Sequence, residues 1–146
     1  MRTPAVYLFV CLATLAAIGL HATTPALSAA DAWVRAIPGA DVAAAYLTLR
    51  NAGAQPITIV GVRSPLAGMA MIHETKLVGT QSTMRPREQL RLAPGETVRF
   101  APGGLHVMLH MLAHPLKPGD EVPLVLLLED GGTLEVTARV HPLGQD

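Results

Sequence analysis

The chain has little cysteine, few aromatic residues and no excess of charge, and each shortage excludes a class of protein. Its 146 residues include one cysteine and 3% aromatic residues. One thiol supports neither a disulfide framework nor a cysteine-based metal site. Eleven basic and eleven acidic residues balance, so charge gives no argument for nucleic-acid binding. The few aromatic side chains offer little surface for stacking on bases or sugars.

Apolar residues are concentrated at the start of the chain. Arg2 provides a short positive region, residues 5–20 are almost uninterrupted in apolar character, and Ser28-Ala29-Ala30 ends a smaller, more polar stretch. Signal peptidase requires small residues at the last and third-last positions before its cut. We therefore predict a cleaved secretory signal peptide at residues 1–30. An uncleaved membrane anchor is the alternative, but the apolar run is short for a span of about 20 residues.

The expected cut leaves residues 31–146 as one mature domain without cysteine. Cys11 lies in the middle of the leader, and the bulky Val10 before it argues against a lipoprotein cut there. No later apolar run is long enough to cross a bilayer. We therefore predict an exported, periplasmic domain with no membrane span after cleavage, and a length that suits a single core.

Prolines and glycines interrupt the mature chain at short intervals, with β-type runs between them. This pattern favours an all-β sandwich or barrel in a single domain. Asp-Gly in the stretch 129–132 is a strong hairpin signal, and we expect a second hairpin around the turn 93–96. The expected strands are residues 43–51, 57–62, 89–92, 97–100, 122–128 and 133–140.

Histidine and methionine alternate with apolar residues in two further segments. Side chains two apart share a face of a strand, so His106, Met108 and His110 should line one face of residues 105–111. In residues 69–73 the same period aligns Met69, Met71 and His73. Met84 lies in the segment between these strands. Packing is an alternative explanation for Met69 and Met71, because methionine commonly fills gaps in cores.

Four of these residues form the spacing His-x10-Met-x21-His-x-Met, namely His73, Met84, His106 and Met108. Two imidazoles and two thioethers make a soft, neutral donor set. Such a set suits Cu(I) better than zinc, calcium or magnesium, which prefer thiolate, imidazole or oxygen ligands. We therefore predict a Cu(I) site at these residues, with His110 and Met71 as auxiliary candidates.

At these residues the chain resembles the PCu(A)C periplasmic copper chaperones, whose signature is this spacing. The likeness runs through essentially the whole mature chain, including Ile72-His73-Glu74-Thr75, Met84-Arg85-Pro86 and Pro102-Gly103-Gly104-Leu105-His106-Val107-Met108-Leu109. The resemblance implies a cupredoxin-like, Greek-key sandwich that binds one Cu(I) per chain at an exposed rim. It also implies copper delivery toward the dinuclear centre of cytochrome c oxidase. The expected partners are the copper-bearing oxidase subunit or a thioredoxin-like copper assembly factor.

Two departures from the family pattern bear on the site. Many members carry an apolar residue and then glycine after His-x-Met-Leu, where this chain has His110-Met111. The extra imidazole could add a ligand, admit Cu(II) or have no effect. Some members also carry a long C-terminal extension rich in histidine and methionine. This chain has no such stretch after residue 140, so we expect no second site of that kind.

Other functions fit the sequence less well. No Ser/His/Asp spacing supports an enzyme, and we interpret Glu74, beside His73, as a solvated charge at a strand end. A blue-copper electron carrier needs a cysteine thiolate, which the mature chain lacks. The main alternative is a periplasmic copper storage or resistance protein without a dedicated acceptor, because copper binding alone looks the same from sequence. A metal-free structural sandwich is the third possibility.

Overall fold

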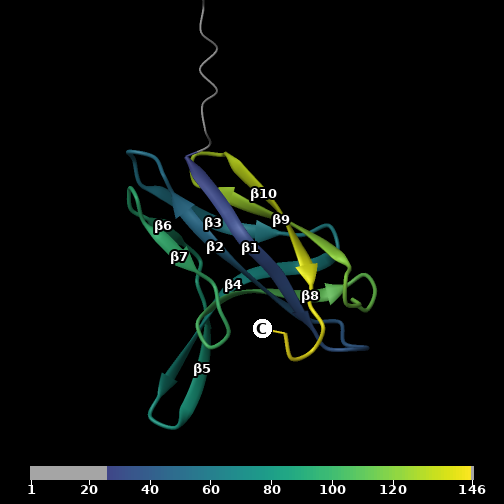
Figure 1. Cartoon of the computed structure of the whole chain (residues 1–146). Helices are drawn as coiled ribbons and strands as arrows, with labels where there is room; N and C mark the ends of the chain where they lie inside the picture. Colours follow the sequence, from purple (N-terminus) through teal and green to yellow (C-terminus); the bar gives the residue numbers. More distant parts are fainter. Residues whose placement is uncertain (1–25, 146) are drawn as a thin grey trace, which may run out of the picture.

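The computed structural model describes residues 26–145, which contain ten β-strands and no helix (Figure 1). The strands are β1 (Leu27–Ala36), β2 (Ala43–Asn51), β3 (Ile57–Arg63), β4 (Ala67–Val78), β5 (Gln81–Pro86), β6 (Leu90–Leu92), β7 (Thr97–Arg99), β8 (Leu105–Leu112), β9 (Glu121–Leu128) and β10 (Thr133–Val140). The predicted fold class, all-β in a single domain, is confirmed. Most of the expected signal peptide lies outside the described residues.

Hydrogen bonds join nine strands in the order β5-β4-β8-β2-β1-β10-β9-β3-β6, and β7 pairs with β2. The two edges of β2 explain how the sheet folds over. One edge pairs with β1 along most of its length, whereas the other edge pairs first with β8 and then with β7. β3 and β4, near opposite ends of the strand order, also contact each other. The sheet therefore curls into a closed sandwich around one core.

The core consists of the inward-facing residues of alternating strands. Its largest fully buried apolar side chains are aliphatic and come from most of the strands: Val34, Leu47, Leu49, Ile59, Leu92, Val107, Leu109, Val122, Leu124, Leu126 and Val140. Burying each such side chain contributes about 1.5–3 kcal/mol relative to leaving it in water. Val107 and Leu109 belong to β8, so the core fixes the strand that carries the histidine and methionine residues on its other face.

The prediction of a hairpin around residues 93–96 is wrong, although the turn itself is present. The amide of Glu96 donates to the carbonyl of Ala93 at 3.0 Å, and the Glu96 carboxylate accepts the Ala93 amide at 2.6 Å. The flanking strands do not pair with each other: β6 pairs with β3, and β7 pairs with β2. Each has three residues, and each pairs with a longer strand, so the turn carries the chain from one layer to the other.

The first strand begins before the expected end of the signal peptide. Leu27 pairs with Asn51, and Leu27 is 5% exposed and part of the core. The amide of Ala52 also donates to the carbonyl of Ala26 at 2.7 Å. A cut after Ala30 would therefore remove four paired residues of β1. Within residues 26–145, no helix is long and apolar enough to span a bilayer.

Candidate metal centre

The histidine and methionine residues of β4 and β8 lie in pairs across two neighbouring antiparallel strands. His73 lies opposite His106, Met71 opposite Met108, and Met69 opposite His110. Because residues two apart share a face, these three pairs form three successive rungs on one side of the sheet. The alternate residues Ile72, Val107 and Leu109 are buried in the core. The structure thus brings together residues more than thirty positions apart in sequence.

Met84 reaches this face from a third strand. β5 pairs with β4, and Met84 lies opposite Thr75, two residues beyond His73 on the same face. The β4–β5 hairpin projects from the body of the sandwich (Figure 1), and Met84 is 53% exposed. Met84 is therefore the most accessible of the four predicted ligands, and it is positioned by a hairpin rather than by the core.

A tight turn before β8 fixes the position of His106. The amide of Gly104 donates to the carbonyl of Ala101 at 3.0 Å, and Gly103 has a φ of 79°. Proline at the second position and glycine at the third are typical of a type II turn, which requires a positive φ there. Pro102-Gly103 satisfies both requirements. The turn therefore follows directly from the sequence and starts β8 in the register that pairs His106 with His73.

The carbonyl of Gly104 selects the tautomer of His106. It lies 3.0 Å from Nδ1 of His106, so a protonated Nδ1 donates to it, and it also accepts the amide of Thr75 at 3.0 Å. With its proton on Nδ1, the ring has a free lone pair on Nε2. Nε2 of His106 is buried and has no hydrogen-bond partner. A backbone carbonyl on one ring nitrogen and a free second nitrogen is the usual arrangement of a metal-binding histidine.

His73 has a similar unpaired nitrogen and a lowered pKa. Its Nδ1 is buried without a hydrogen-bond partner, and its ring lies 5.9 Å from that of His106 and 6.5 Å from that of His110, measured between centroids. Burial lowers the pKa of His73, and the nearby His106 and His110 rings lower it further. The imidazole of His73 is therefore held in the neutral form, which is the form that binds metal.

A metal site on this face would include thioether sulfur. Among the described residues, no group of three His, Cys, Asp or Glu side chains is placed to hold a metal ion. The unpaired imidazole nitrogens of His73 and His106, together with Met84 and Met108 on the same face, fit a soft monovalent ion that accepts sulfur. Counted from the His73–His106 rung, Met71 lies one rung away and His110 lies two rungs away, and both are partly buried.

Sequence reasoning missed the aromatic residues behind His106. The ring of Tyr46 lies 6.4 Å from that of His106 and 4.5 Å from that of Trp33, which in turn stacks on His141 at 5.0 Å. Tyr46 is buried. The direct pairing of Trp33 with Tyr46 between β1 and β2 creates this contact. No spacing in the sequence indicates it, because the strand register that makes it is a property of the whole sheet.

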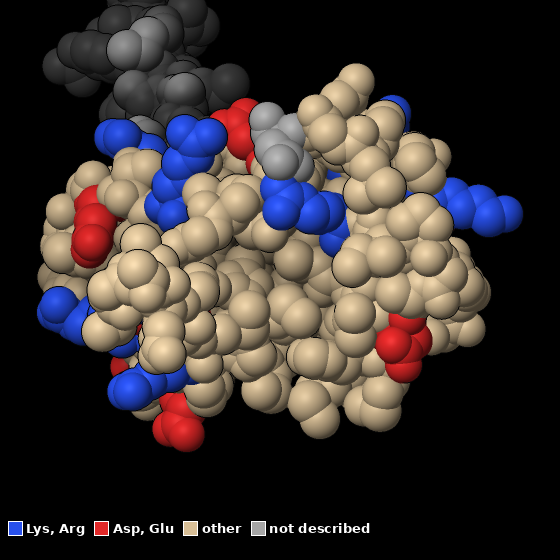
Figure 2. All heavy atoms as spheres, turned by 90° about the horizontal axis from the view of Figure 1, so that it is seen from below, with Lys and Arg blue, Asp and Glu red and all other residues tan. Residues whose placement is uncertain are grey.

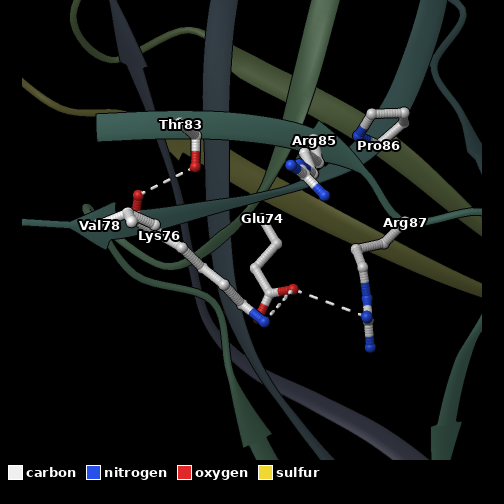
Figure 3. A pocket seen from close by; sticks show the side chains of 7 residues that line it. All are labelled: Glu74, Lys76, Val78, Thr83, Arg85, Pro86 and Arg87. Carbon is white, nitrogen blue, oxygen red and sulfur yellow. Dashed lines mark hydrogen bonds and ion pairs between the residues drawn. The ribbon is translucent and has the colours of Figure 1, made fainter. Parts of the chain in front are cut away.

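The two faces of the β4–β5 hairpin differ in charge. Glu74 and its neighbours face away from the histidines and line a hollow of about 340 Å³ (Figure 3). Glu74 forms ion pairs with Lys76 at 3.4 Å and Arg87 at 3.6 Å. Its partly buried carboxylate is thus paired with basic side chains rather than placed beside the metal-binding residues. Seen from the end where the hairpin projects, most of the surface is uncharged (Figure 2).

Fold and side chains together define the class of protein: a cupredoxin-like sandwich with imidazole and thioether side chains gathered on one face. Residues 27–140 match the family described as "Putative lipoprotein LpqE-like". The chain therefore belongs to this LpqE-like family, which is of the PCu(A)C type. The resemblance predicted from the sequence is confirmed.

Solved structures with the same fold support this assignment. The chain is 35% identical to the Cu(I) form of DR1885 from Deinococcus radiodurans, with a TM-score of 0.60, covering 83% of this chain and 81% of that one. It is 26% identical to the apo PCuAC domain from PmoF1, with a TM-score of 0.65, covering 80% and 95%. The copper-bound PCuAC domain from PmoF2, at 24% identity and a TM-score of 0.65, covers 80% and 92% and shows the shared fold.

A curated relative is the protein named "Putative lipoprotein Lxx21020" from Leifsonia xyli subsp. xyli (strain CTCB07). The two are 34% identical over 110 residues, which are 75% of this chain. The match spans 66% of the length of that relative.

Proposed function

We propose that this protein is an exported Cu(I)-binding metallochaperone that holds one Cu(I) through His73, Met84, His106 and Met108. The observation that carries the proposal is the unpaired, buried Nε2 of His106, whose tautomer is fixed by Gly104. An orphaned buried nitrogen costs free energy unless a partner completes it. The solved relative DR1885 binds Cu(I), which supports copper as that partner.

The four ligands suit copper transfer because they are neutral and differ in exposure. His106 is 4% exposed, whereas Met84 is 53% exposed on the projecting hairpin. Neutral ligands are exchanged one at a time without stranding a buried charge. We propose that an incoming ligand from the acceptor first replaces Met84 while His73, His106 and Met108 still hold the ion. The acceptor we propose is the copper-bearing subunit of cytochrome c oxidase or a thioredoxin-like copper assembly factor.

We also propose that the protein acts in the periplasm after removal of an N-terminal leader. The family and a relative carry the name lipoprotein, which supports export. Because Leu27 is a core residue, we place the cut before it. Thr24 and Ala26 are small residues at the third-last and last positions before Leu27, as signal peptidase requires. Mass spectrometry of the exported protein determines the first residue, and a start at Asp31 would contradict this placement.

The test of copper binding is an anaerobic titration with Cu(I) against a chromophoric Cu(I) chelator. We expect one tight equivalent in the parent and a loss of at least 100-fold in affinity in the Met84→Ala/Met108→Ala variant, because two of four ligands are removed. The matched control is Met111→Ala, which removes an exposed thioether that packs against Gly68. No competition by the parent, or equal losses in both variants, would defeat the assignment.

Transfer is tested next with the soluble copper-binding domain of an oxidase subunit. We expect the copper-loaded protein to pass its ion to this acceptor within minutes, without free copper that a chelator in solution intercepts. Retention of copper beside the apo acceptor would instead favour storage or resistance. We propose no enzymatic activity for the protein, and two of the similar solved structures are copper-bound forms, the PCuAC domain from PmoF2 and DR1885.

A further inference from the structure

We infer that Met69, Met71 and His110 form a second Cu(I) site directly beside the first, so that the chain holds two ions at high copper. The inference rests on the proposed function and extends it. Met69 and His110 form one rung of the β4–β8 pair, and Met71 and Met108 form the next. These three residues offer two thioethers and one imidazole on neighbouring rungs, and none of the three is among the four proposed ligands of the first ion.

The spacing of these rungs suits a metal ion. Residues directly opposite on antiparallel strands have Cβ atoms about 4.5–5.5 Å apart, and neighbours on one face of a strand are about 6.6 Å apart. Met69, Met71 and His110 occupy three corners of such a quadrilateral. Methionine has three rotatable side-chain bonds, so its sulfur adjusts readily to an ion above the rungs. Three soft donors are enough for Cu(I), which imposes little geometry.

Core packing does not account for these residues. Met69 is 46% exposed, and Met71 and His110 are partly buried on the outer face of the strands. The core side of the same segments is already filled by Ile72 and Leu109. Within residues 26–145 the His110 ring has no hydrogen-bond partner, and its contact is with the ring of His73. A partly buried imidazole beside two thioethers is thus left for a ligand.

The second set adjoins the first along one rung. Met71 lies opposite Met108, a proposed ligand of the first ion, and the His110 ring lies 6.5 Å from that of His73. An ion bound by Met69, Met71 and His110, the outer set, would therefore lie within one rung of the four proposed ligands of the first ion, the inner set. The outer set should bind more weakly, because it has one imidazole, its Met69 is half exposed, and a second positive ion nearby is repelled.

The test is an anaerobic Cu(I) titration of the whole domain, followed by NMR of the methionine εCH₃ groups. The five methionines after Met1 give five separate reporters. We expect the first equivalent to shift the methyls of Met84 and Met108, and the second equivalent to shift those of Met69 and Met71. The methyl of Met111 should not move, because it packs against Gly68 rather than on the rungs.

The matched variant is Met69→Leu, which keeps side-chain volume on an exposed face. We expect it to lose the second equivalent, with the affinity for the first changed less than threefold. Saturation of the parent at one equivalent would overturn the inference. So would movement of Met71 together with Met84 at the first equivalent, since His110 and Met71 would then serve the first ion. Response of Met69 and Met71 without Met84 and Met108 would support this site and refute the proposed primary one.

Discussion

Copper affinity should fall as pH falls, but protonation of His73 should contribute less to this loss than protonation of an ordinary histidine would. A proton and Cu(I) compete for the same imidazole nitrogen, so each histidine ligand must be neutral to bind. Burial, and then the neighbouring His106 and His110 rings, lower the pKa of His73 below its ordinary value of 6.5. Protonation of His73 therefore competes with copper only at pH values below that.

The magnitude follows from this competition. One imidazole with the ordinary pKa of about 6.5 reduces the apparent affinity by about 30-fold between pH 7.5 and pH 5. Because the pKa of His73 is lowered, its own part is smaller than 30-fold. Protonation of His73 should therefore account for less than about 30-fold of the measured loss. The two thioethers add no dependence on pH, since methionine does not titrate in this range.

The assay is chelator competition at half-unit steps of pH, with the protonation of the chelator measured separately. NMR of the His73 ring in the apo protein gives its pKa directly. A flat affinity over this range would refute ligation by histidine, and a His73 pKa at or above 6.5 would refute the lowered pKa. The same shift also acts on the apo fold: the unfolded chain takes up the proton at higher pH than the folded one. Stability should therefore decrease as pH falls below 6.5.

Three further predictions concern the scaffold. A chain that begins at Asp31 loses the buried Leu27 and four residues of strand pairing. Its free energy of unfolding in urea should therefore be about 2–4 kcal/mol lower than that of a chain that begins at Leu27. Equal midpoints of urea unfolding for the two chains would contradict this. Asn51→Ala removes a buried amide that donates to two backbone carbonyls. Thermal unfolding should show a loss of about 2–3 kcal/mol in the free energy of unfolding. A loss below about 0.5 kcal/mol would argue against these hydrogen bonds. Leu124→Ala should lower the free energy of unfolding by about 2–5 kcal/mol, because it leaves a cavity in the core. The Cu(I) affinity of the folded protein should stay unchanged. A weakened affinity would show that the core around Leu124 also shapes the site.

Much of the fold could be predicted from local pattern. β2 and β10 have the bounds that the sequence predicts, and β9 begins one residue earlier. In these strands alternation and turn signals agree, because each strand has one face in the core. The error at residues 93–96 has a physical reason: a turn fixes only the local direction of the chain. Which strand each flanking segment pairs with depends on the curl of the whole sheet.

The candidate site, like the fold, could be predicted only in part from the sequence. The period of two placed His106 and Met108 on one face, and the structure agrees. The exact rungs could not be predicted, since they depend on the register between β4 and β8. The tautomer of His106 could not be predicted either, because it depends on the carbonyl of Gly104. The type II turn that brings this carbonyl to the ring was visible as Pro102-Gly103, but its contact with the imidazole was not.

The arrangement of ligands suggests an order for copper release. His106 is anchored by the core strand β8 and by the carbonyl of Gly104, so it is the ligand that moves least. Met84 is carried by a hairpin outside the core and is half exposed. Replacement of a ligand needs both access for the incoming group and freedom for the outgoing one, and Met84 has both. On the proposed function, the thioether of Met84 is therefore exchanged first and the imidazole of His106 last.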